Sequence, residues 1–167
     1  ALAFEPGERA LYRRRPRPPD EGVLDYLLVE RLVVVGIWLA AGTLAIFYWD
    51  YFYRSSSLEL ARVSAVTTLV LFQAVHVFNC RSEDISIFKK SLLSNKVLFL
   101  GVLASLGLHM AALYLPWTQE LLAFQPLSSW DVWFVTLGMA LTAIVVSELH
   151  KWLRPRAAPS REATSTV

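Results

Sequence analysis

The chain has 167 residues, of which 55% are hydrophobic and 18% are charged, and its formal net charge is +2. Ordinary soluble domains are about 45–50% apolar, and here the excess is concentrated in long blocks with almost no charge. The single cysteine, Cys80, excludes an intrachain disulfide and a CxxC redox or zinc motif. The small net charge argues neither for nor against a nucleic-acid partner, and we predict none.

The first segment, residues 1–29, is basic and rich in proline. Four of the eight prolines lie within residues 5–20, together with a run of arginines. Such a segment cannot be helical throughout, so we expect an extended cytoplasmic loop. The chain starts with alanine and shows no signal-peptide pattern. We therefore expect it to be a processed protein or a piece of a longer one.

Four apolar blocks follow, at residues 32–49, 63–78, 97–115 and 130–149. A helix needs roughly 20 mostly apolar residues to cross a bilayer, and about 17 can suffice. The second block is the shortest, so it either gains a turn at one end or lies in thinner bilayer. The blocks are apolar all round and do not alternate, which excludes amphipathic helices and strands.

The predicted fold class is therefore all-α: a polytopic membrane bundle with four transmembrane helices. It occupies residues 30–154 and is followed by a disordered cytoplasmic tail at residues 155–167, which is rich in Pro, Ala, Ser and Thr. Of the 16 basic residues, 14 lie before the first block, between the second and third blocks, or after the fourth block. The positive-inside rule then predicts that both termini are cytoplasmic.

Polar side chains inside a membrane are costly and are candidates for function. Gln73, His76 and Cys80 share one face of the second block, and Asn79 lies near its cytoplasmic end. The Gln73 carbonyl suits a hard cation as one ligand among several; the alternative is a hydrogen bond between helices. For His76 and for His109 in the third block, a hydrogen bond to a neighbouring helix is favoured over a metal role.

The fourth block carries polar residues at both ends. Asp131 lies at its start, where a carboxylate is favourable, and Glu148 and His150 lie at its other end, where we expect them to be solvated. Small residues four apart predict close helix neighbours for the first, third and fourth blocks. These pairs are Gly36 and Ala40, Ala41 and Ala45, Gly101 and Ser105, and Gly138 and Thr142.

Motifs for chemistry are absent from the sequence. It contains no GxxxxGK[ST] phosphate loop, no HExxH and no GxSxG, and we expect no pair of carboxylates inside the membrane, because Asp131 and Glu148 lie at opposite ends of the fourth block. We predict no catalytic residue, no cofactor-binding residue and no enzymatic activity for this chain on its own.

Several short strings, in this order and with these gaps, resemble the C-terminal membrane region of P-type cation-transporting ATPases. The resemblance is to the calcium-pump-like branch of secretory-pathway and bacterial members, and it runs from residue 1 to about residue 154. The strings are residues 1–6 and 14–17, residues 78–83 (Phe-Asn-Cys-Arg-Ser-Glu), residues 94–96, the pairs Leu115-Pro116 and Pro126-Leu127, and residues 148–151.

The resemblance implies that the four spans are helices seven to ten of a ten-helix pump. Such helices brace the transport helices, and the residues for ATP chemistry lie elsewhere, since DKTG, TGES and GDG are missing here. The parent pump would use ATP and Mg²⁺. The implied partners are its remaining transmembrane and cytoplasmic domains, the lipid bilayer and, transiently, a divalent cation, Ca²⁺ or Mn²⁺.

The resemblance also assigns roles to individual residues. Gln73 matches a position that supplies a cation ligand in muscle-type pumps, where it is glutamate. The neutral amide favours a single-ion pump, or a place for Gln73 beside the ligands rather than among them. Arg14, Arg15 and Arg17 match the cytoplasmic loop that couples the membrane domain to the phosphorylation domain; a solvated run of charge is the alternative.

Two other readings of the chain stay open. It could be a stand-alone four-helix membrane protein, such as an assembly subunit or the partner of a split pump. It could also be a four-helix membrane redox enzyme, although the single cysteine argues against this class.

Overall fold

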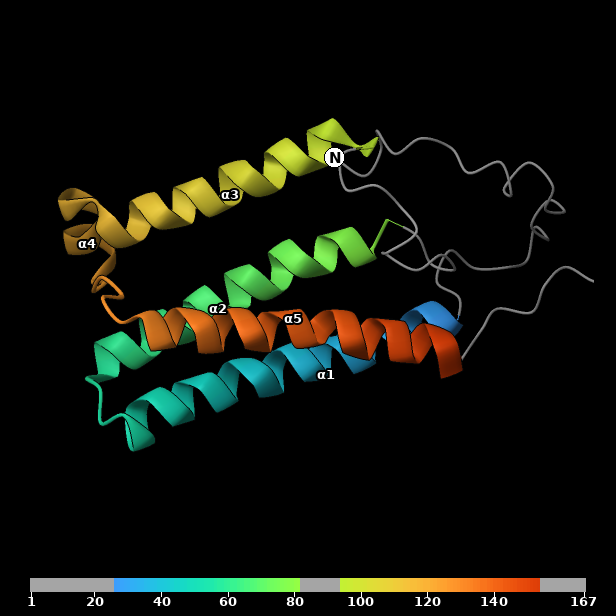
Figure 1. The fold of residues 1–167 in the computed structure, drawn as a ribbon, viewed down its shortest axis with the longest axis horizontal. Coiled ribbons are helices and arrows are strands. Elements are labelled where there is room, and N and C mark those ends of the chain that lie inside the picture. The colour runs from blue at the N-terminus through green and yellow to red at the C-terminus, as the bar shows by residue number, and fades with distance from the viewer. Residues whose placement is uncertain (1–25, 82–93, 154–167) are drawn as a thin grey trace, which may run out of the picture.

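The structure is a computed structural model that describes residues 26–81 and 94–153 (Figure 1). This part of the chain is helical and contains no strand, and four of its helices are long and apolar enough to cross a membrane. The prediction of an all-α bundle with four spanning helices is confirmed. The elements are α1 (Tyr26–Tyr48), η3 (Trp49–Tyr53), α2 (Leu58–Asn79), α3 (Lys96–Tyr114), α4 (Pro116–Leu122) and α5 (Trp130–Leu153).

The helices extend beyond the apolar blocks. Helix α1 begins at Tyr26 and continues through η3, a π-helical turn that ends at Tyr53. Helix α2 begins at Leu58, where the Ser57 side chain accepts a hydrogen bond from the Leu60 amide at 3.2 Å. This N-cap satisfies one of the amide groups that a helix start leaves open. The shortest predicted block thereby becomes a helix of 22 residues.

Helix α4 lies where the sequence predicted only a loop. Pro116 stops α3 and occupies the first turn of the new helix, a position where the missing amide is harmless. The Thr118 hydroxyl lies 2.7 Å from the Leu115 carbonyl oxygen and 3.0 Å from that of Ala111, so it caps the end of α3. Ala123, with a left-handed φ of 51°, ends α4. The chain therefore folds back against α3 before it enters α5.

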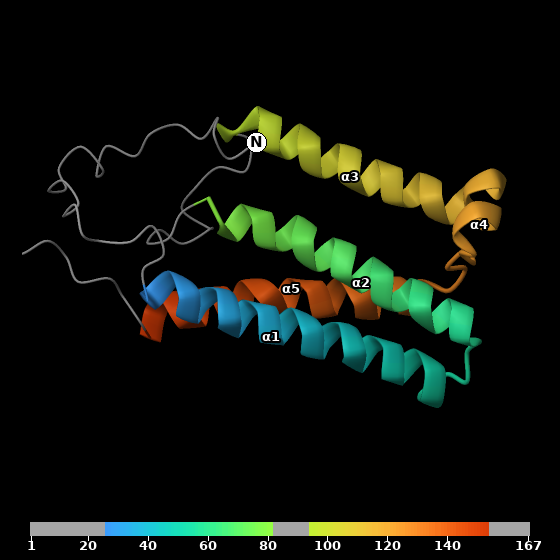
Figure 2. The same cartoon turned by 180° about the vertical axis from the view of Figure 1, so that it is seen from behind.

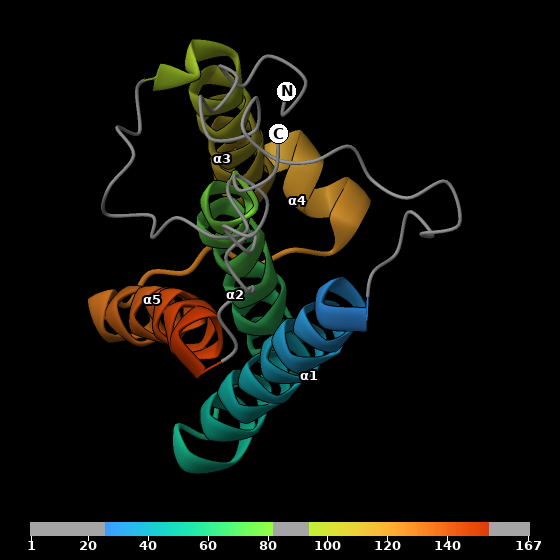
Figure 3. The ribbon, with the colours of Figure 1, turned by 90° about the vertical axis from the view of Figure 1, so that its right-hand side faces the viewer.

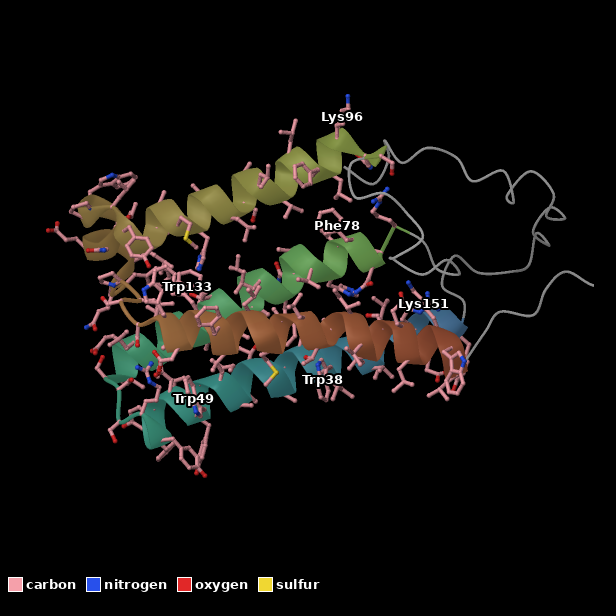
Figure 4. The ribbon with its side chains drawn as sticks, in the orientation of Figure 1. Trp38, Trp49, Phe78, Lys96, Trp133 and Lys151 are labelled. Carbon is pink, nitrogen blue, oxygen red and sulfur yellow. The ribbon has the colours of Figure 1, made fainter. Side chains whose placement is uncertain are left out.

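Consecutive long helices run antiparallel, so α2 and α5 point the same way, as do α1 and α3 (Figure 1). Helix α2 lies at the centre when the domain is viewed along the helices (Figure 3). Helices α1 and α5 pack against α2 and against each other, whereas α3 packs chiefly against α2 from another side (Figure 2). Figure 4 shows Trp49 and Trp133 at one end of the bundle, which we call the Asp50 end. Lys96 and Lys151 lie at the other, the Lys151 end.

The buried core is divided along the bundle. At the Asp50 end, Val63, Leu113, Leu127 and Val132 form one cluster, which draws on α2, α3 and α5. Farther along, Phe72 of α2 packs with Ala140 and Ala143 of α5 in a second cluster, to which α3 adds no residue. Helix α3 thus contributes to these two clusters only from its C-terminal half.

Close helix packing occurs at a glycine outside the predicted small-residue pairs. A Cβ atom added to Gly42 of α1 would lie 2.7 Å from the Phe72 ring, so only glycine allows this approach. By contrast, a Cβ atom added to Gly36, Gly101 or Gly138 would meet nothing within 4 Å. The glycines of the predicted pairs therefore face away from the interior of the described domain.

Candidate functional site

Gln73 lies on an open groove between α2 and α3. The groove has a volume of about 300 Å³, and the other residues that line it are apolar or small: Val70, Ala74, Val77, Leu98, Gly101, Val102 and Ser105. Gln73 is exposed, and its amide has no hydrogen-bond partner among the described residues. The groove thus presents one strongly polar side chain within the spanning part of α2.

His76 lies one turn from Gln73 and pairs within its own helix. Its Nε2 atom is 3.4 Å from the Cys80 Sγ atom. Partial burial of the thiol raises the pKa of Cys80, while the positive charges of Lys151 and Arg31 act in the opposite direction. The predicted hydrogen bond from His76 to another helix is absent from the described part of the chain.

Asn79, the last residue of α2, joins α2 to α5. It is buried, and its Nδ2 atom donates to the Ser147 hydroxyl at 3.4 Å. This contact is structural, because it ties two helices together. The arrangement leaves Gln73 apart from Asn79, with only the former open to the groove.

The expectation that His150 is solvated is wrong, whereas Glu148 keeps part of its side chain exposed. His150 is only 7% exposed, and its Nε2 atom lies 3.6 Å from a carboxylate oxygen of Glu30 in α1. Glu148 accepts a hydrogen bond from Lys151 at 3.1 Å. Helix α5 runs on to Leu153, so His150 packs between α5 and α1 at the Lys151 end instead of leaving the bundle.

His109 makes the kind of contact that was predicted for a membrane histidine. Its Nε2 atom lies 3.1 Å from the hydroxyl oxygen of Thr67, which is fully buried in α2. His109 also lines a second hollow of about 440 Å³, which shares Val70 and Ser105 with the Gln73 groove. The Thr67–His109 hydrogen bond therefore joins the two walls of one continuous furrow.

A polar network at the Asp50 end was missed by the sequence analysis. Asp50 is fully buried in η3, and its carboxylate accepts hydrogen bonds from Ser64 at 2.5 Å and from Ser56 at 2.8 Å. Arg54 lies 3.4 Å from the same carboxylate. Asp50 directly follows an apolar block and lies among aromatic residues, so the sequence alone did not single it out. Arg54, four residues later, is the signal that could have indicated a buried ion pair.

Arg54 extends this network to α5. Its Nε atom lies 3.2 Å from Asp131, and its guanidinium also donates to Ser129 at 3.2 Å and lies over the Trp49 ring. Charges that share hydrogen bonds in this way can be retained away from water. The network ties η3, α2 and the start of α5 together at the Asp50 end.

The remaining predicted site residues lie outside the described ranges. Arg14, Arg15 and Arg17 belong to residues 1–25, whose structure is not described. Within residues 26–81 and 94–153, no group of three or more His, Cys, Asp or Glu side chains could hold a metal ion. A cation bound at Gln73 would therefore need most of its ligands from other parts of a larger protein.

Comparison with known proteins identifies the domain. Residues 1–153 match the family described as "Cation transporting ATPase, C-terminus". The chain belongs to this family. It is a C-terminal membrane domain of the P-type ATPases, a multi-pass domain with four spanning helices.

Individual relatives agree with this family. The chain is 33% identical over 140 residues to the "Calcium-transporting ATPase" of Bacillus subtilis and 32% identical over 155 residues to the "Probable cation-transporting ATPase F" of Mycobacterium tuberculosis. It is 30% identical over 151 residues to the "Calcium-transporting ATPase type 2C member 2" of Mus musculus. These matches cover 84%, 93% and 90% of the chain but only 16%, 17% and 16% of the relatives.

Proposed function

We propose that this domain braces the transport helices of a P-type cation pump, and that Gln73 presents its amide to the transported cation or to the ligands beside it. The parent pump would supply the remaining transmembrane helices and the cytoplasmic domains that use ATP and Mg²⁺. The relatives' names favour a cation pump, and two of the three quoted above name calcium. Ca²⁺ or Mn²⁺ is the cation proposed here.

The observation that carries this proposal is the unpartnered amide of Gln73. A polar group that faces hydrocarbon without a partner costs several kcal/mol, roughly 2–7 on transfer scales. Gln73 has no hydrogen-bond partner among the described residues and is exposed on the groove. A docked helix with polar groups, or a cation between that helix and Gln73, would remove this cost.

The open glycine faces support the bracing role. Gly36 of α1, Gly101 of α3 and Gly138 of α5 are exposed, and each has room for another backbone to approach. Small residues are typical of membrane helix interfaces because they allow this approach. Gly101 lines the Gln73 groove itself, so the same surface offers close packing and a polar ligand.

The distribution of basic residues supports an orientation for the domain. With 14 of the 16 lysines and arginines in the segments on one side, the Lys151 end is proposed to be cytoplasmic and the Asp50 end to face the opposite compartment. Both termini would then be cytoplasmic. The basic segment with Arg14, Arg15 and Arg17 would lie beside the pump's cytoplasmic domains, where it could couple the two parts.

The proposal is tested by Gln73→Leu and Gln73→Glu in the full-length pump. Transport is measured as a function of Ca²⁺ and of Mn²⁺ concentration in sealed vesicles. Loss of one oxygen ligand is expected to raise the apparent KM for the transported cation about tenfold, which corresponds to ~1.4 kcal/mol. The glutamate, which adds a negative charge, is expected to change the relative preference for the two cations.

Gln125→Leu is the matched control, because Gln125 is an exposed glutamine in the loop before α5. It should leave both KM values unchanged. Wild-type KM values in both Gln73 variants, for both cations, would contradict a cation-facing role for Gln73.

A further inference from the structure

We propose that His109 is a positioning residue for the Gln73 groove: its hydrogen bond to Thr67 fixes α3 against α2 and so sets the width of the groove that Gln73 faces. This inference rests on the proposed function, because it assigns the control of the same site. The hydrogen bond spans 3.1 Å between Nε2 of His109 and the Thr67 hydroxyl oxygen.

The position of this hydrogen bond along α3 is the first argument. On the Asp50 side of His109, Met110 packs against the core cluster and Leu113 is fully buried within it. On the other side, Ser105 and Gly101 line the open groove. The bond therefore lies between the end of α3 that joins the first core cluster and the stretch of α3 that lines the Gln73 groove.

The burial of both partners is the second argument. Thr67 is fully buried, and His109 is 7% exposed. In an apolar environment neither side chain can exchange this hydrogen bond for one to water, so separating the helices would leave the His109 imidazole without this partner. The contact thus resists a movement of α3 away from α2 more strongly than apolar packing alone.

The shared lining of the two hollows links this contact to Gln73. Val70 and Ser105 line both the Gln73 groove and the hollow that His109 lines. A helix seated in the furrow would touch α2 on one wall and α3 on the other. Loosening the Thr67–His109 contact would displace one wall, and a ligand set shared between Gln73 and the seated helix would lose its geometry.

The neighbouring residue Thr68 provides a matched control. Like Thr67 it is fully buried in α2, but its hydroxyl donates to the Ser64 carbonyl oxygen of the same helix at 2.8 Å. Thr67→Val and Thr68→Val remove the same group from adjacent positions. Only the former removes a contact between α2 and α3.

The test measures KM for the cation and kcat separately in the full-length pump. Thr67→Val and His109→Leu are each expected to raise KM about threefold, the size of an average hydrogen bond between membrane helices, with kcat nearly unchanged. The double variant should be no worse than either single variant, because both remove one contact. Thr67→Ser and His109→Gln, which retain hydrogen-bonding groups, should restore KM, and Thr68→Val should leave it unchanged.

Combination with Gln73→Leu separates this inference from the proposed function. If Gln73→Leu raises KM and adding His109→Leu raises it no further, both stand. If Gln73→Leu raises KM but Thr67→Val and His109→Leu leave it unchanged, lower only kcat, or act additively, the positioning role is overturned and the role of Gln73 remains. If Gln73→Leu alone leaves KM unchanged, the proposed function fails, and the positioning role fails with it.

Discussion

Two parts of this domain are built differently. Helices α1, α2 and α5 are joined at three levels: by the Asp50 network at one end, by a hydrogen bond from Trp38 to Thr142 at 2.8 Å in the middle, and by the Asn79–Ser147 contact at the other end. Helix α3 joins the first core cluster through its C-terminal half, and residues of its N-terminal half, among them the buried Leu98, line the open groove.

This difference indicates that the two parts of the domain have different roles. In a membrane, apolar packing alone gives little preference for one helix neighbour over another, so buried polar contacts and close backbone approach specify the arrangement. The three-helix unit has both kinds of contact. The groove beside α3 has an unsatisfied amide and an open glycine instead, which are the features expected of a surface that a further helix covers.

The largest effect within the three-helix unit is expected from Asp50→Ala. The substitution leaves the Ser64 hydroxyl without its partner and removes one of two carboxylates from Arg54. Because Arg54 keeps Asp131 and is partly exposed, we expect a loss of about 3 kcal/mol, at the low end for a broken buried ion pair. The purified chain is unfolded with SDS in mixed micelles and followed by tryptophan fluorescence.

Asp131→Ala is the control for Asp50→Ala, because it removes the other, exposed carboxylate from the same arginine. Its unfolding curve should stay close to the wild type. An equal loss of stability in the two variants would show that burial of Asp50 does not distinguish them.

The next effect is expected from Gly42→Ala. The added methyl group would lie 2.7 Å from the ring of Phe72, which is fully buried, and 3.3 Å from the Met139 sulfur. Overpacking of this kind costs about 2 kcal/mol, measured by the same unfolding titration. Gly36→Ala on the open face of α1 should change the stability of the purified chain by less than about 0.5 kcal/mol, and comparable losses in the two variants would contradict the assignment of faces.

A smaller effect is expected from Trp38→Phe, which removes the hydrogen bond to Thr142 in the middle of the unit. An average hydrogen bond between membrane helices contributes ~0.6 kcal/mol. Trp152→Phe is the control, because Trp152 is 77% exposed at the end of α5. Equal stability of the two variants would show that the Trp38–Thr142 hydrogen bond does not stabilise the three-helix unit.

The smallest effect is expected on the alkylation rate of Cys80, the single cysteine of the chain. This rate reports the packing at the Lys151 end. Partial burial raises the pKa of this thiol, so the reactive thiolate is scarcer than in a free cysteine at neutral pH. Alkylation by iodoacetamide should therefore be slow at pH 7.5 and should accelerate as the pH rises towards the raised pKa.

Lys151 of α5 lowers the pKa of Cys80, so Lys151→Gln should raise it further and slow alkylation. Lys96→Gln, at the same end but on α3, should leave the rate unchanged, since Lys96 is not among the groups that shift this pKa. The opposite pattern would place α3, rather than α5, beside Cys80.

The sequence was sufficient for the four spans, because length and hydrophobicity alone decide which segments can cross a bilayer. It also indicated Gln73, since a lone amide in an apolar block is unusual. It could not indicate Gly42, whose role depends on the Phe72 ring of another helix, nor Asp50, whose partners come from later segments. Helix α4 was missed because its start at Pro116 and its short length resemble a loop.

Cover of the α2/α3 groove by other helices of a pump is the central claim made here for this domain. A diazirine amino acid at Val102, which lines the groove, and one at Leu103, which is 48% exposed and does not line it, are photoactivated in the full-length protein in membranes. Mass spectrometry identifies the products. Cross-links from position 102 to peptides outside this domain, with lipid adducts from position 103, are the predicted result. Lipid adducts from both positions would contradict the claim.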